Sequence, residues 1–234
     1  MNSNLALNGF RHRRAPPWRL YIRTMNGLQS RPCGINKSKT GGGRGKRKRK
    51  SDESKERAGL PQGLMYVPQW IPADLQRRYI AELDAPATWS RGLDRLTQHF
   101  GARYDYKTRK LVYDVPPLTS SYIVDAIARA LQPNFTALNG GVIDQCIVND
   151  YRPKQRITAH TDSPLFGPVI ATVSLGSATV MRFTRPGYKT FDVILNGGDV
   201  VFLTGESRTL WKHELLPVNK PSFRRVSLTF RHIE

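Results

Sequence analysis

A histidine and a carboxylate two positions apart stand in the stretch AHTDSP, in the second half of a 234-residue chain. In a β-strand, residues i and i+2 project from the same face about 7 Å apart, so His160 and Asp162 could bind one metal ion. Ordinary composition supplies such a pair in roughly one of four chains with five histidines, so the pair alone does not establish a metal site. The case for a metal depends on residues elsewhere in the chain.

The last stretch of the chain, RVSLTFR, alternates polar and apolar residues as a β-strand does. Its apolar face must pack against a core. Its polar face has two interpretations: ordinary exposure to solvent, or an interior pocket in which two arginines clamp a carboxylate through paired hydrogen bonds. The polar face consists of Arg225, Ser227, Thr229 and Arg231.

Three further residues are able to complete a site of this kind. Asn149 and Tyr151 share one face of a strand that leads into the His-x-Asp stretch, and their amide and phenol groups could join an anion pocket. His213 follows the strand-like run GDVVFLTG and could be a third metal ligand. Two histidines and one carboxylate are the ligand set of non-haem ferrous iron, and they leave one side of the metal open.

The positive charge is concentrated at the start of the chain. Residues 1–58 contain sixteen Lys or Arg against three acidic residues, a balance of +13 out of the formal +19, which leaves +6 for the remainder. Residues 36–59 lack core-forming side chains, so we predict that residues 1–59 form a disordered basic tail. The cluster from Gly45 to Lys50 is typical of phosphate-binding and nuclear-import segments, while an Arg-rich N-terminus is also typical of organelle transit peptides. Both compartments stay open.

The body of the chain, residues 60–234, is expected to be one domain that is mainly β with flanking helices. Helices are predicted over residues 73–84 and over SSYIVDAIARALQP, ending at Pro133, with a hairpin or ordered loop in HFGARYDYKTRKLVYDVP. From Gly141 onward, short apolar or alternating runs separated by turn residues predict strand after strand. This pattern favours a sandwich or barrel, with a jelly roll among the choices.

Composition excludes several classes of protein. Two cysteines are too few for a disulfide framework or a four-cysteine zinc cluster, which favours a reducing intracellular compartment. No apolar run approaches the roughly 18 residues that a transmembrane helix requires, so we expect no membrane association. A monomer is expected.

The ordered series Asn149-x-Tyr151, His160-x-Asp162, His213 and Arg225-x-Ser227-x-Thr229-x-Arg231 resembles the AlkB family of Fe(II) and 2-oxoglutarate dependent dioxygenases. The stretches HFGARYDY, SLGSATVMRF and GDVVFLTGESRTLWKH are similar to that family as well. The resemblance covers residues 60–234. It implies a double-stranded β-helix (jelly-roll) core over residues 141–234, preceded by an α/β nucleotide-recognition segment over residues 60–140.

The resemblance also implies roles for the site residues. His160, Asp162 and His213 would bind Fe(II), and O2 would be the oxidant. Arg225 would pair with the distal carboxylate of 2-oxoglutarate, the cosubstrate, and Arg231 would lie near its other carboxylate. Further cosubstrate contacts would come from Asn149, Tyr151, Ser227 and Thr229.

For the substrate, charge and resemblance together favour nucleic acid, either DNA or RNA. Tyr104 and Tyr106 are predicted to flank an extruded base, with Arg95 or Arg103 on phosphate. The expected activity is oxidative demethylation of an alkylated base, in DNA repair or RNA demethylation, with release of succinate, CO2 and formaldehyde. Hydroxylation of a modified tRNA base and demethylation of a protein side chain remain alternatives.

Two alternatives of another class also remain at this stage, a basic nucleic-acid-binding protein without enzymatic activity and a zinc hydrolase on a cupin-like barrel. The chain departs from the AlkB pattern at four places. Some base-repair members have acidic residues after His-x-Asp that face a cationic base, where this chain has Ser163 and Pro164. Lys154 replaces a frequent glycine, Ser227 a frequent asparagine, and Glu214 a small residue.

Overall fold

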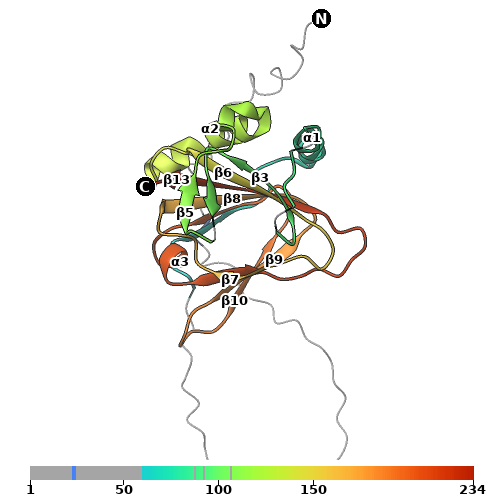
Figure 1. Ribbon diagram of the computed structural model, residues 1–234. Helices are drawn as coiled ribbons and strands as arrows, with labels where there is room; N and C mark the ends of the chain where they lie inside the picture. Colours follow the sequence, from blue (N-terminus) through green and yellow to red (C-terminus); the bar gives the residue numbers. More distant parts are fainter. Residues whose placement is uncertain (1–22, 25–59, 87, 92, 106) are drawn as a thin grey trace, which may run out of the picture.

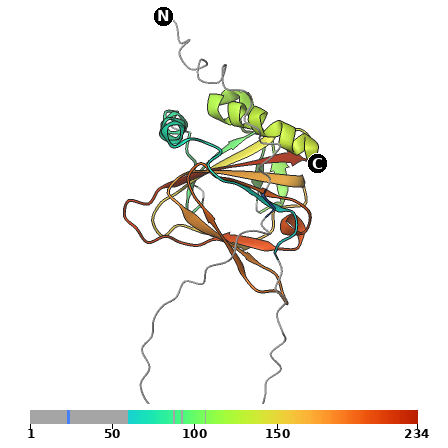
Figure 2. The same cartoon turned by 180° about the vertical axis from the view of Figure 1, so that it is seen from behind.

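The computed structural model describes residues 23–24, 60–86, 88–91, 93–105 and 107–234 (Figure 1). Two antiparallel sheets form the body of the protein, with helices on the outer side of the larger sheet (Figure 1, Figure 2). Most of the predicted tail lies outside the described residues. Arg23 and Thr24 form a short strand that pairs with Met65 and Tyr66, so the prediction of a fully disordered tail is wrong at these two positions.

The strands of the described residues are β1 (Arg23–Thr24), β2 (Leu64–Val67), β3 (Leu96–Phe100), β4 (Arg103–Asp105), β5 (Lys110–Val112), β6 (Gln145–Tyr151), β7 (Ile157–His160), β8 (Phe166–Gly176), β9 (Thr179–Thr184), β10 (Phe191–Leu195), β11 (Val200–Leu203), β12 (Lys212–Leu215) and β13 (Arg225–Ile233). The helices are α1 (Ala73–Asp84), the 3-10 turn η3 (Leu118–Ser120), α2 (Tyr122–Ala137) and α3 (Gly205–Thr209). The larger sheet has the order β1-β2-β11-β8-β13-β6-β3, and the smaller has the order β10-β9-β12-β7. β4 and β5 form a separate hairpin, as predicted.

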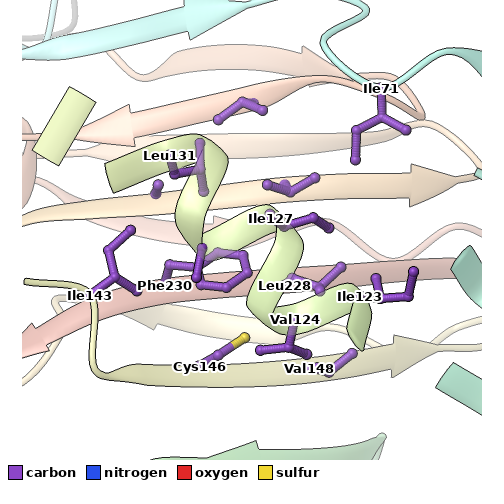
Figure 3. Close-up of a cluster of buried hydrophobic side chains, with 14 of the residues drawn as sticks. Ile71, Ile123, Val124, Ile127, Leu131, Ile143, Cys146, Val148, Leu228 and Phe230 are labelled. Atoms are coloured by element: carbon purple, nitrogen blue, oxygen red, sulfur yellow. The ribbon is translucent and has the colours of Figure 1, made fainter. Parts of the chain in front are cut away.

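The outer face of the larger sheet is apolar and packs against α2. The helix begins after Ser121, whose Oγ accepts a hydrogen bond from the Val124 backbone N–H at 3.4 Å. Its apolar residues recur every three or four positions and are buried on the sheet, each stabilising the fold by roughly 1.5–3 kcal/mol. In Figure 3 the helix contributes Ile123, Val124, Ile127 and Leu131 to this core, and β6 and β13 contribute Cys146, Val148, Leu228 and Phe230.

The inner face of the same sheet is polar and is directed toward the smaller sheet. Antiparallel pairing places Arg225 opposite Tyr151 and Ser227 opposite Asn149, and residues paired in this way share a face. The predicted alternation of the last strand is therefore confirmed. Its polar face is enclosed rather than solvated, because Arg225 and Ser227 are 1% and 2% exposed.

Helix α2 continues beyond the predicted end at Pro133 to Ala137. Proline removes one backbone donor, but Leu131 and Phe135, four residues apart, are both fully buried in the outer core, and their packing keeps the last turn helical. β2 and β3 were not predicted as strands, yet both belong to the larger sheet. No helix among the described residues is long and apolar enough to cross a lipid bilayer.

Candidate active site

Two neighbouring strands of the smaller sheet bring two histidines together. His160, at the end of β7, lies opposite His213 of β12, and their ring centroids are 4.4 Å apart. The carboxylate of Asp162 approaches the same point, with Oδ2 3.5 Å from Nε2 of His213. One ligand atom from each residue lies within 4.8 Å of the others, and no second group of this kind occurs in the part of the chain that is described.

Asp162 reaches this point from a turn and not from a strand. Because β7 ends at His160, the prediction that both residues project from one strand face is corrected. The turn is held by Arg208 of α3, which is 5% exposed. Its Nη1 donates to the Asp162 carbonyl at 3.0 Å. Its Nη2 donates to the carbonyls of Ser163 and Phe166 at 2.7 and 3.1 Å, so one buried side chain fixes the segment that carries the carboxylate.

The electrostatics of the cluster favour metal binding. Burial raises the pKa of Asp162, but the charge of Arg231, with smaller contributions from the nearby histidines and Arg208, outweighs burial and holds that pKa well below its usual range. Burial lowers the pKa of His213 to about 4, against the attraction of Asp162. His160 donates from Nδ1 to the Thr158 carbonyl at 2.8 Å, which leaves Nε2 with its lone pair. A metal requires ligands in these deprotonated forms.

Arg225 is a buried cation on the inner face of the larger sheet. It is 1% exposed, and only its Nη2 is hydrogen-bonded, to Ser174 Oγ at 2.9 Å. Its Nε and Nη1 are buried without a partner among the described residues. Burial lowers the pKa of Arg225 to about 10, so the guanidinium remains charged at neutral pH. A buried cation with two unused donors fits one end of a dicarboxylate.

Arg231 contacts the metal-ligand cluster directly. Its Nη2 lies 2.6 Å from Asp162 Oδ1, its Nη1 donates to Gln145 Oε1 at 3.1 Å, and its guanidinium carbon lies 4.6 Å from the centroid of the Phe166 ring. These contacts orient the carboxylate of Asp162. The predicted role of Arg231 beside the second carboxylate of 2-oxoglutarate stays a prediction.

The remaining predicted cosubstrate residues line the same inner face. Asn149 is buried, and its Oδ1 accepts a hydrogen bond from Arg95 Nε at 2.6 Å. The ring of Tyr151 has two arginines beside it, with the Arg225 and Arg95 guanidinium carbons 5.5 and 5.6 Å from its centroid. Buried hydroxyl groups complete this face: Ser227 is paired in the sheet with Asn149 and Ser174, and Thr229 Oγ1 lies 3.2 Å from Thr172 Oγ1.

A cavity of about 430 Å³ opens onto the metal-ligand cluster. Tyr104, one of the residues predicted to flank a base, lines this cavity, and its ring centroid lies 6.3 Å from that of Phe166. Tyr106 lies outside the described residues. Arg103 is partly exposed and paired with Asp114 at 2.8 Å. Arg95 lines the cavity and is 7% exposed, which places it inside the site rather than on the surface.

Sequence reasoning did not identify four residues of this site. Gln145 shares the inner face of β6 with Asn149 and Tyr151, and the alternation of that strand would have found it. Ser174 lies on β8 and His99 on β3, and the order of strands in the larger sheet determines where each lies relative to the site. Arg208 had no signal in the sequence, because its partners are carbonyl groups more than forty residues away.

The geometry agrees with comparisons to known proteins. Residues 63–231 match the family described as the 2OG-Fe(II) oxygenase superfamily. The chain belongs to this family. Among individual 2OG-Fe(II) oxygenases, the Escherichia coli (strain K12) "Alpha-ketoglutarate-dependent dioxygenase AlkB" is 36% identical over 100 residues, which are 38% of this chain and 44% of that protein. The solved structure of OsALKBH1 has a TM-score of 0.58 and 20% identity, and covers 74% of this chain and 98% of that chain.

The longest matches among curated relatives of this oxygenase include a protein much longer than the matched segment. The Mus musculus "tRNA (carboxymethyluridine(34)-5-O)-methyltransferase ALKBH8" is 31% identical over 170 residues, which are 68% of this chain and 25% of that protein. The chain therefore spans about a quarter of the length of this relative. The AlkB-like 2OG-Fe(II) oxygenase fold, expected as a jelly roll, is confirmed.

As a 2OG-Fe(II) oxygenase, the protein is a 2-oxoglutarate-dependent dioxygenase that uses Fe(II), 2-oxoglutarate and O2. The residues present fit these groups: three ligand atoms converge for the metal, and two unused donors of Arg225 await a carboxylate. His160, Asp162 and His213 would hold iron, and Arg225 would hold the distal end of the cosubstrate. A non-enzymatic scaffold and a zinc hydrolase are set aside, because neither accounts for the family and for Arg225 together.

The structure describes three of the positions that depart from the AlkB pattern. Lys154 adopts a φ of 68°, the left-handed conformation that favours glycine, so the turn keeps the backbone shape of a glycine turn. Ser163 lines the cavity, where an acidic residue would face the substrate. Glu214 is half-buried in β12, with its side chain on the opposite face from His213.

Proposed function

We propose that this dioxygenase oxidises an alkylated base in nucleic acid. The observation that carries the proposal is the cavity of about 430 Å³ in front of His160 and Asp162, because its size suits a base that has left its stack. Tyr104 and Phe166 provide aromatic walls for such a base. The names of the relatives support the choice, since ALKBH8 is named as a tRNA-modifying enzyme.

Basic side chains flank the cavity on two sides and support a polyphosphate partner. The hairpin of β4 and β5, which contains Tyr104, exposes Lys107, Arg109 and Lys110. The segment that leads into β7 exposes Lys154 and Arg156 immediately before the cavity-lining Ile157. Phosphate contacts from such residues supply affinity without sequence information and weaken as salt rises.

Bound Fe(II), 2-oxoglutarate and O2 together supply a two-electron oxidation that converts a C–H bond of the substrate into C–OH, with succinate and CO2 as coproducts. The residues of the chain hold and orient these groups. Arg225 anchors the distal carboxylate, Arg231 and Arg208 keep Asp162 ionised and in place, and Tyr104 and Phe166 exclude water from one side of the substrate. When the oxidised carbon is an N-methyl group, the hydroxymethyl product releases formaldehyde.

Hydroxylation of a modified tRNA base is the second candidate, favoured by the match to ALKBH8 over two thirds of this chain. In that case the hydroxylated carbon would be bonded to carbon, and the product would keep the added oxygen. Demethylation of a protein side chain has no supporting contact among the described residues.

Mass spectrometry of methylated DNA and RNA oligonucleotides before and after reaction distinguishes these outcomes. Loss of about 14 mass units, one CH2, indicates demethylation, and gain of about 16, one oxygen atom, indicates stable hydroxylation. Asp162→Ala should abolish the change, whereas Arg77→Gln, a change of an exposed residue on α1, should not. If wild-type protein that forms succinate alters no nucleic-acid substrate, the proposed function fails.

A further inference from the structure

The charge lining the active-site cavity is unusual for an enzyme that would bind a cationic base. Two arginines, Arg95 and Arg231, line the cavity together with a single carboxylate, Asp162. Arg231 is neutralised by Asp162 at 2.6 Å. Arg95 forms no ion pair with a carboxylate of the described chain, and its one hydrogen bond is the donation from Nε to the Asn149 amide oxygen. Its terminal nitrogens therefore remain as uncompensated donors inside the site.

Asp162 is not available to a positively charged base. Its Oδ1 is bonded to Arg231, and its Oδ2 faces His213 on the metal side. The next position that lines the cavity is Ser163, whose hydroxyl accepts a hydrogen bond from the Leu165 backbone N–H at 3.3 Å. No other acidic side chain lines this cavity in the part of the chain that is described.

Filling the site with its cofactors does not remove the excess of positive charge. Arg95, Arg225 and Arg231 with Fe(II) carry five positive charges, against three negative charges from Asp162 and 2-oxoglutarate. His99 also lines the cavity. Burial, and then the positive charges of Arg231, Arg103 and Arg95, lower the pKa of His99 to about 4. The ring of His99 is therefore neutral at neutral pH and adds no positive charge of its own.

We propose that the base bound in this cavity is uncharged or anionic, and that Arg95 excludes cationic methylated bases such as 1-methyladenine and 3-methylcytosine. The inference rests on the proposed function, because it names the substrate class of the same site. Two like charges about 7 Å apart in a medium of effective dielectric near 20 repel each other. This repulsion should favour a neutral base over a cationic base by at least about tenfold. A base with a carbonyl or carboxylate acceptor gains hydrogen bonds from the terminal nitrogens of Arg95.

Pairs of isomeric methylated bases test the charge rule, because their neutral forms have the same atoms but only one member of each pair binds an extra proton and is cationic at neutral pH. Matched oligonucleotides would carry N6-methyladenine or 1-methyladenine, and N4-methylcytosine or 3-methylcytosine. We expect at least about tenfold higher kcat/KM for each neutral isomer, and tighter binding of it by fluorescence anisotropy with Mn(II) and 2-oxoglutarate bound. Equal or better binding of the cationic isomers would overturn the inference even if bases are oxidised.

Variants at Arg95 test whether its charge causes the preference for neutral over cationic bases. Arg95→Gln removes the charge and should lower the neutral-to-cationic ratio by roughly tenfold, while Arg95→Lys keeps the charge and should keep the ratio. Arg77→Gln, an exposed arginine on α1, is the control for general charge effects. If the ratio is the same in Arg95→Gln as in the wild type, Arg95 is not the selective residue. The proposed function fails separately, when succinate forms but no base is oxidised.

Discussion

Arg208 is expected to determine how well the site binds its metal, although it is not a metal ligand. Both of its terminal nitrogens donate to carbonyl groups of the turn that carries Asp162, at 2.7 to 3.1 Å, and the side chain is 5% exposed. Arg208→Met leaves the carbonyl groups of Asp162, Ser163 and Phe166 without their charged donor. At about 1–2 kcal/mol for each, the free energy of unfolding should fall by about 3–6 kcal/mol.

Loss of Arg208 should also weaken metal binding, because Arg208 holds the segment that carries Asp162. Without Arg208 the segment from Asp162 to Phe166 is no longer fixed, and the carboxylate must be ordered when the metal binds. Loss of such a supporting contact weakens metal binding by roughly 10–100-fold. Arg208→Lys keeps the charge but reaches fewer carbonyl groups, so its affinity should lie between those of the wild type and the methionine variant.

The assay combines urea unfolding of the metal-free protein with titration of Fe(II) under anaerobic conditions, or of Mn(II). Arg224→Met is the matched control. Arg224 bonds Asp84 and the buried Asp150 at 2.7 and 3.0 Å on the outer side of the sheet, so its loss should lower stability without changing metal affinity. Equal metal dissociation constants for the wild type and Arg208→Met would refute the reasoning, whatever the loss of stability.

Three further outcomes are expected. Arg225→Gln should raise the KM for 2-oxoglutarate by at least about tenfold. Metal affinity should stay unchanged, because the one hydrogen bond that the Arg225 side chain makes to the described residues is to Ser174 and not to a metal ligand. Steady-state kinetics with varied 2-oxoglutarate checks the change in KM. Lys154→Gly should stabilise the protein by up to about 1 kcal/mol in urea unfolding, since φ is 68° at this position, and an unchanged midpoint would contradict it. The pKa of His99 in the folded protein, about 4, lies below its value in the unfolded chain. As the pH falls, the unfolded chain therefore binds the proton first, and the folded protein loses stability below the unfolded pKa. From about pH 7.5 to pH 5 the metal-free protein should lose about 2 kcal/mol through His99, a loss that His99→Gln should remove.

The side chains that share the inner face of the last strand could be predicted from the sequence because strand alternation is a local property. The order of polar and apolar residues in RVSLTFR determines which side chains share a face, whichever strands lie beside it. The pair His160 and Asp162 was also found by local spacing, but for an incorrect reason. Asp162 lies in a turn, and its position depends on Arg208, which no spacing rule connects with it.

Where a charged side chain lies in the folded protein was harder to predict than which side chains share a strand face. Arg95 was expected on phosphate because it lies beside the segment that resembles the nucleotide-recognition part of the AlkB family. The structure buries it beside Asn149 and Tyr151, because it directly precedes β3, which pairs with the strand that carries both of these residues. The end of α2 was misplaced for a related reason. The breaking tendency of Pro133 is a local property, while the burial of Phe135 that overrides it depends on the whole core.

Three arginines of the described residues are buried, and they differ in which of their nitrogens are hydrogen-bonded. This difference separates their roles. Both terminal nitrogens of Arg208 are bonded to carbonyl groups that hold the segment from Asp162 to Phe166, and only its Nε has no partner among the described residues. Arg225 has one of three nitrogens bonded, and leaving the other two buried costs stability that only a bound anion recovers. Arg95 is bonded at Nε alone and borders the cavity, where an incoming base would meet its charge. An arginine whose two terminal nitrogens are bonded to the chain supports structure, whereas one whose terminal nitrogens are left for a ligand selects what enters the cavity, which is why the charge of the substrate base is the property most directly testable at this site.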